Sequence, residues 1–223
     1  MKLVTFQTME ALKELINKGY LEVDAKYIDA KKMGHTYDWV VEKMNEYVSN
    51  TYNTKFPLWC WVKFKNGICP PKHKGIPVKG VDVKITFEKP REEVFITDYR
   101  RYSFLLNNVY IPDNKYEKEL FEKELEQYGI TLEELKAVVR KDKYPSQRTD
   151  KEFLEICQKI RKSFDRCIDE KSDILQGCVW RINLDEVKKI EMLYDTEYSY
   201  GTFNYIRKSG KRFNWINDFY NKL

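Results

Sequence analysis

Residues 3–21 read LVTFQTMEALKELINKGYL, and this stretch decides how the fold begins. Its first residues alternate, so an expected strand over residues 2–7 carries Thr5 and Gln7 on one face and Val4 and Phe6 on the other. Residues 9–18 then place apolar side chains at helical spacing, and Gly19 follows as a stop signal. The chain therefore opens with a strand and an amphipathic helix, with two polar side chains displayed on one strand face.

Composition bounds the class of protein. The 223 residues are 42% hydrophobic and 15% aromatic, which suits a chain with a real core and excludes wholesale disorder. Forty basic residues nearly balance 35 acidic ones, so the whole surface is not an electrostatic nucleic-acid binder. The five cysteines form no C-x-x-C pair and there are two histidines, which predicts free thiols and no metal site. No leader and no apolar run of about 18–20 residues is found, so we expect a cytoplasmic protein without a membrane partner.

The remaining patterns alternate between helices and strands. A helix is expected from Thr36, as N-cap, to residue 49 with Tyr47 on its core face, and strands are expected over 57–64, 81–88 and 93–98. Helices follow near 99–108, over 115–143 with a capping box at Thr131, and over 150–168, before two late strands. These elements predict an α+β domain over residues 1–197, with a mixed or antiparallel sheet core and helices packed around it. Residues 198–223 form a basic, aromatic C-terminal extension.

Several blocks, in order, resemble a bacterial and phage family, domain-of-unknown-function family 3841. They are MKLVTFQT, TYDWVVEKM, FPLWCWVKF, ITFEKPREEVFITDYRRYSFLLNN and LQGCVWRINLDEVKKI. The resemblance covers the chain to about residue 194 and leaves the tail beyond about residue 200 outside it. The resemblance implies how the domain is organised along the chain, and it implies no biochemical activity.

The opening also resembles NAD-dependent ADP-ribosyltransferases. Those enzymes open with a strand carrying His-x-Thr or Arg-x-Ser, and here Thr5 and Gln7 stand at the two positions. Gln176 falls where the catalytic acid would be, and Trp59 or Trp61 would fill the middle position, for which the strand over 81–88 is the alternative. The resemblance implies an ADP-ribosyltransferase-like fold that uses NAD and no metal. A neutral amide at 176 keeps a hydrogen bond and loses the charge, which implies nucleotide binding with weak turnover.

Each of these residues also has a plain structural interpretation. Thr5 and Gln7 can be exposed polar residues of a strand, and two tryptophans at i and i+2 are core in many sheets. Asp98 is a good N-cap for the helix that follows it, and the competing hypothesis is a ribose or amide contact together with Tyr102 and Asn107. Gln176, next to a glycine, can mark a bulge.

The tail is the second candidate region. Basic residues there attract phosphate and interleaved aromatic residues stack on bases, although the same pattern also suits a hairpin and a helix that pack on the domain. The candidate partner-binding residues are Arg207, Lys208, Lys211, Arg212 and Trp215.

Two functions stay open. One is a nucleotide-binding protein of ADP-ribosyltransferase-like build, a divergent or weakly active transferase. The other is a non-enzymatic protein of phage–host conflict that binds nucleic acid or a protein.

Overall fold

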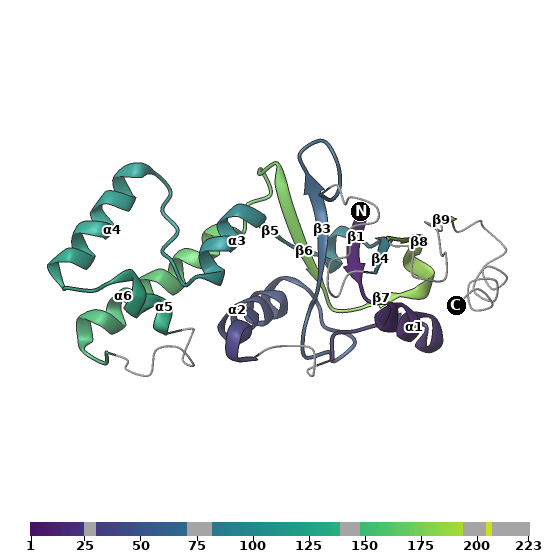
Figure 1. The fold of residues 1–223 in the computed structure, drawn as a ribbon, viewed down its shortest axis with the longest axis horizontal. Coiled ribbons are helices and arrows are strands. Elements are labelled where there is room, and N and C mark those ends of the chain that lie inside the picture. The colour runs from purple at the N-terminus through teal and green to yellow at the C-terminus, as the bar shows by residue number, and fades with distance from the viewer. Residues whose placement is uncertain (25–29, 71–81, 139–147, 194–203, 207–223) are drawn as a thin grey trace. The chain divides into compact units, whose positions relative to one another are not determined.

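The computed structural model of the chain describes residues 1–24, 30–70, 82–138, 148–193 and 204–206 (Figure 1). Helices and β-strands are both well represented in these ranges, so the α+β prediction is confirmed. The chain packs as two compact units. Unit 1 comprises Met1–Val23, Met44–Phe95 and Gln176–Leu223, and unit 2 comprises Asp24–Lys43 and Ile96–Leu175.

A seven-stranded sheet is the framework of the fold, in the order β5-β6-β3-β1-β4-β8-β9. Central strand β1 pairs antiparallel with β3 and β4, β4 pairs antiparallel with β8, and β8 with β9. The short strands β2 and β7 form a second, two-stranded sheet. The strands are β1 (Lys2–Gln7), β2 (Tyr20–Leu21), β3 (Leu58–Phe64), β4 (Val83–Glu88), β5 (Phe95–Asp98), β6 (Ile174–Val179), β7 (Ile182–Asn183), β8 (Val187–Met192) and β9 (Asn204–Ile206).

The opening strand and helix form where the sequence predicts them. Helix α1 (Met9–Lys18) begins after Thr8, whose side chain accepts a hydrogen bond from the Ala11 amide at 3.1 Å. It ends at Gly19, whose φ of 79° lies in the left-handed region that glycine adopts without a steric penalty. Leu12, Leu15 and Ile16 are buried, so the apolar stripe of α1 is part of the core.

Strand register defines the core face of the sheet in unit 1. Leu3 lies opposite Phe87, Thr5 opposite Ile85, and Ile85 opposite Ile190, so these side chains share one face. All of them are buried, and each large apolar side chain there contributes roughly 1.5–3 kcal/mol relative to exposure. Thr5 is the polar member of this apolar face.

A buried cation links β4 to the segment before β8 in unit 1. The Lys89 side chain is almost fully buried, and its ammonium contacts carboxylate oxygens of Glu93 at 2.9 Å and Glu186 at 2.7 Å. The Lys89 backbone carbonyl accepts a hydrogen bond from the amino group of Met1. This ion pair network therefore holds the N-terminus and the end of β4 to the chain leading into β8.

Unit 2 is helical. It contains most of α2 (Ala30–Tyr47), together with α3 (Tyr99–Leu106), α4 (Lys115–Gln127), α5 (Leu132–Ala137) and α6 (Lys151–Ser163), which continues into a 3-10 turn, Phe164–Cys167. The capping box predicted at Thr131 is confirmed, because its hydroxyl accepts from the Glu134 amide and Glu134 accepts from the Thr131 amide. Figure 1 shows α4 beside α6, where Lys159 of α6 pairs with Glu124 of α4.

Three local predictions were wrong. Helix α2 begins at Ala30, so Thr36 lies inside it and is not its N-cap. Tyr47 is the last residue of the helix and is 60% exposed, although its ring contacts Phe95 with centroids 5.9 Å apart. Helix α6 stops at Ser163, and Phe164–Cys167 of the predicted helix tighten into 3-10 geometry.

Candidate functional site

Thr5 and Gln7 lie together on β1, as two residues on one strand face should. The Thr5 side chain, 2% exposed, donates a hydrogen bond to the Trp59 carbonyl at 2.9 Å. It also accepts one from the Gln7 side-chain amide at 2.7 Å. The Thr5 hydroxyl is thus used to tie β1 to β3.

Gln176 lies on the other face of the sheet. Val4 pairs with Trp61, so Cys60 and Val62 share the face of Thr5. A Cβ built on Gly177 would meet the Val62 side chain at 2.9 Å, which places the side-chain direction of Gly177 on that same face. Gln176, one residue earlier, therefore points to the opposite face. The register brings Thr5 and Gln7 together and does not bring Gln176 to them.

The Gln176 side chain shares its face with Trp59 and Trp61, two of the residues predicted to contact a cofactor. Both indoles are half-buried, and the Trp61 ring packs edge-to-face on Phe64 with centroids 5.9 Å apart. Gln176 is 8% exposed, and its amide nitrogen has no hydrogen-bond partner among the residues that the structure describes. A buried amide donor left unpaired costs about 1–3 kcal/mol. This amide is therefore the polar group of β6 that a ligand could satisfy.

Helix α3 and its two caps contain three of the predicted site residues, Asp98, Tyr102 and Asn107. The Asp98 carboxylate accepts hydrogen bonds from the Arg100 and Arg101 amides at 2.7 and 3.2 Å, so the predicted N-cap is confirmed. Asn107 is the C-cap residue, and its side-chain amide donates to the Ser103 carbonyl at 2.8 Å. Tyr102 is buried on the same helix. A ribose or amide contact by these three residues stays a prediction.

The tail candidates Arg207, Lys208, Lys211, Arg212 and Trp215 lie outside the described residues, and so does the lysine-rich loop over 72–79. Within the described ranges, no group of three or more His, Cys, Asp or Glu side chains could hold a metal ion. No described helix is long and apolar enough to cross a bilayer.

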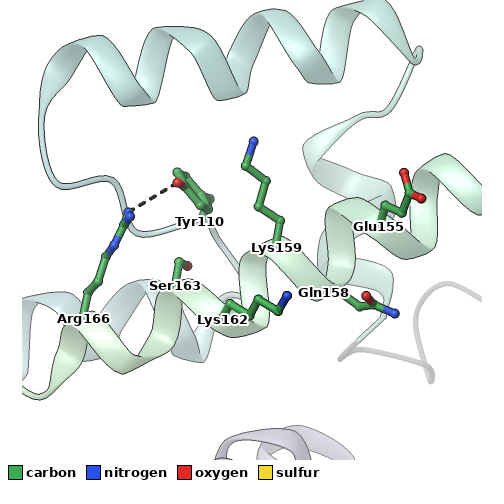
Figure 2. Close-up of a pocket in the computed structure, with 7 residues that line it drawn as sticks. All are labelled: Tyr110, Glu155, Gln158, Lys159, Lys162, Ser163 and Arg166. Carbon is green, nitrogen blue, oxygen red and sulfur yellow. Dashed lines mark hydrogen bonds between the residues drawn. The ribbon is translucent and has the colours of Figure 1, made fainter.

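A cavity of about 390 Å³ lies in unit 2, on the polar face of α6 (Figure 2). Its lining follows helical spacing along α6 and the 3-10 turn, and Tyr110 from the segment between α3 and α4 faces that row across the hollow. Three of the lining residues are cations. The residues contributed by α6 and the turn are Glu155, Gln158, Lys159, Lys162, Ser163 and Arg166.

Arg166 forms one wall of this cavity and is held rigidly. Its guanidinium donates to both carboxylate oxygens of Glu117, at 2.7 and 3.0 Å, and to the Tyr110 hydroxyl at 3.3 Å. Tyr110 also donates to Glu117. The hydrogen bonds from Arg166, from Tyr110 and from the Asp113 amide lower the pKa of Glu117 to about 2. The charge of Arg166 is therefore matched by an anion within the protein.

The two lysines of the cavity differ in their pairing. Lys159 pairs with Glu124, and its ammonium lies 5.9 and 5.6 Å from the ring centroids of Tyr110 and Phe121, which stack at 4.2 Å. Lys162 is exposed and forms no ion pair with the described residues. The cation available to an incoming anion is thus Lys162.

A second hollow, of about 270 Å³, lies on the neighbouring face of α6 and shares Gln158 and Lys162 with the first. It is lined further by Trp39, Glu42, Lys43, Arg161 and Asp165. Here the charges are paired: the Asp165 carboxylate accepts from the Trp39 indole at 3.3 Å and contacts Lys43 at 3.3 Å, and Arg161 contacts Glu42 at 2.5 Å. Lys162 therefore stands on the ridge between the two hollows.

Sequence reasoning missed this region, because charged residues at helical spacing are typical of a solvated helix face. One signal was present in the sequence: Lys159, Lys162 and Arg166 recur at helical spacing opposite the apolar face of α6. The position of Tyr110, which comes from about 50 residues earlier in the chain, carried no local signal.

The comparisons with known proteins identify the family of the chain and no specific biochemical function. The family model described as "Domain of unknown function (DUF3841)" matches residues 2–188, and the chain belongs to this family. A search of curated proteins found no match, and a search of solved structures found none.

Proposed function

We propose that this chain is a nucleotide-binding protein whose ligand occupies the larger α6 cavity with its phosphate on Lys162. The observation that carries the proposal is the unpaired ammonium of Lys162 at the rim of a cavity of about 390 Å³. Ligand pockets for small molecules measure about 300–1,000 Å³, so a mononucleotide suits this volume.

The arrangement of the other lining groups supports the same ligand class. Tyr110 supplies an aromatic edge, and Gln158 offers an amide that forms no hydrogen bond with the described residues. Arg166 is fixed by Glu117 and so forms a rigid, charge-balanced wall that loses no rotamer freedom on binding. Phosphate on Lys162 would form a charge-assisted contact, the strong kind in a partly exposed site.

Titration calorimetry with ADP tests this function. The wild-type protein should bind ADP, and Lys162→Gln should weaken binding about tenfold or more, since a hydrogen bond to a charged group contributes about 1.5–3 kcal/mol. Lys118→Gln on α4 is the matched control, because Lys118 is an exposed lysine that lines neither hollow. Absence of ADP binding at millimolar concentration, or equal loss in both variants, would refute the proposal.

A second candidate, NAD-dependent ADP-ribosyl transfer at Gln176, has one specific observation in its favour. The Gln176 amide is buried, lacks a hydrogen-bond partner, and shares a sheet face with Trp59 and Trp61. Replacing Gln176 by Glu supplies the negative charge that would stabilise an oxocarbenium-like transition state. NAD hydrolysis should rise in Gln176→Glu and not in Gln7→Glu, the same change on the opposite face. No gain in a Gln176→Glu protein that binds NAD would reject this candidate.

The rival function, recognition of nucleic acid or a protein partner through the tail, rests on sequence alone. Replacing Arg207, Lys208, Lys211 and Arg212 by Ser should then lower nucleic-acid affinity and flatten its salt dependence, because fewer counterions are released on binding. Unchanged affinity and salt slope would exclude nucleic acid as the ligand of the tail.

A further inference from the structure

We infer that the ligand of the α6 site is a dinucleotide, with its diphosphate over Lys162 and its two nucleoside ends in the two hollows. This inference rests on the proposed nucleotide site and names its substrate class. The observation behind it is that both hollows open onto the same two side chains, Gln158 and Lys162.

The spacing fits a ligand with a short central linker. Gln158 and Lys162 are four residues apart on α6, so they lie one above the other and span about 6 Å of helix surface. A diphosphate of similar length can contact both of them, while the two nucleosides diverge to either side. A mononucleotide would leave one hollow without an occupant.

The order of charges across α6 supports the same assignment. The lone unpaired cation of the described lining residues, Lys162, stands on the ridge, and the cations beside it are engaged by Glu124, Glu117, Glu42 or Asp165. The ridge therefore carries the excess positive charge that attracts a diphosphate.

Both hollows include carboxylates in their lining. Glu155 lines the first, and Glu42 and Asp165 line the second. Glu42 and Asp165 are paired with Arg161 and Lys43, and a paired carboxylate still has oxygen lone pairs that can accept hydrogen bonds. Carboxylates repel phosphate and accept hydrogen bonds from hydroxyl groups, so they suit the riboses at the two ends of the ligand.

Calorimetric titration with ADP and with diadenosine diphosphate tests the inference. The dinucleotide should bind about tenfold tighter than ADP or better, which corresponds to useful contacts in the second hollow. The double variant Glu42→Gln, Arg161→Gln removes an ion pair of the second hollow without leaving either charge unpaired. It should remove most of that gain and leave ADP affinity unchanged, because neither residue lines the first hollow. The double variant Glu122→Gln, Lys118→Gln removes an exposed pair on α4, and it is the matched control that should preserve the gain.

The outcomes separate the two proposals. ADP binding with no advantage for the dinucleotide overturns the dinucleotide inference and leaves the nucleotide site standing. An advantage that survives in the Glu42→Gln, Arg161→Gln double variant overturns the use of the second hollow. Failure of both ligands to bind overturns both proposals. Thermal unfolding of each variant, compared with wild type, shows that a lost affinity is not a lost fold.

Discussion

The carboxylate of Glu117 should make stability depend on pH in the acid range. It accepts hydrogen bonds from Arg166, from Tyr110 and from the Asp113 amide, and its pKa in the folded protein is about 2 against 4.5 for an unperturbed glutamate. Each pKa unit corresponds to about 1.4 kcal/mol, so the full linkage is at most about 3.4 kcal/mol. The side chain is 27% exposed, which weakens the charge interactions, and we expect about 1–2 kcal/mol.

The sign follows from the direction of the shift. A carboxyl group with a lowered pKa in the folded state stabilises the protein above the pKa of the unfolded chain. That stabilisation is lost as the pH falls from about 4.5 towards 2, where the folded carboxyl also becomes protonated. The free energy of unfolding of the wild type should therefore approach that of Glu117→Gln over this interval.

Urea unfolding at a series of pH values between 7 and 2.5 measures this difference. Glu119→Gln is the matched control, because Glu119 lies on the same helix in an exposed pair with Lys115 at 3.6 Å and should contribute less than about 0.5 kcal/mol. A Glu117→Gln cost no larger than that of the control, or a cost that stays constant down to pH 2.5, would refute the reasoning.

Three further predictions concern the core of unit 1 and the buried thiols. Gly177→Ala should lower the free energy of unfolding, measured by urea unfolding, by about 1–3 kcal/mol, since the added Cβ would lie 2.9 Å from the Val62 side chain. Gly67→Ala is the control, because the atom nearest to its added Cβ is 3.7 Å away. Lys89→Met should cost about 3 kcal/mol or more in the same assay because Glu93 and Glu186 lose their shared cation, and a smaller loss would show that water replaces it. Burial raises the pKa of the Cys167 thiol to about 12 and also raises that of the Cys60 thiol. Neither thiol should therefore react with iodoacetamide at pH 8 until urea unfolds the chain. Modification of either cysteine in the native protein, detected by peptide mass spectrometry, would contradict this prediction.

Local signals predicted the elements well. Gly19 ends α1, Thr131 is the N-cap of α5 and Asp98 is the N-cap of α3, because a cap depends on residues within one turn of it. Alternation also placed Thr5 and Gln7 together, since that relation needs one strand and no partner.

The candidate site depended on relations between strands and helices, which local pattern does not contain. Whether Gln176 faces Thr5 is decided by pairing across β3, and a shift by one residue reverses the face. The α6 cavity needs Tyr110, which stacks on Phe121 of α4, to lie opposite the charged row of α6. Exposed Tyr47 has the same cause, because Val48 beside it is buried and only tertiary packing decides which of two neighbouring residues at the edge of a helical stripe is covered.

The position of β6 in the sheet has a consequence for synthesis of the protein. Strands β1, β3 and β4 leave the ribosome early, but β6 flanks β3 and β8 flanks β4, and both follow the roughly 80 residues from Ile96 to Leu175. At about 5–20 residues per second, translation of that segment takes about 4–16 s. During that time β3, with the sequence LWCWVKF, can pair with β1 on one edge while its other edge still lacks β6. Limited chaperone supply or slowed translation should therefore lower the yield of this protein.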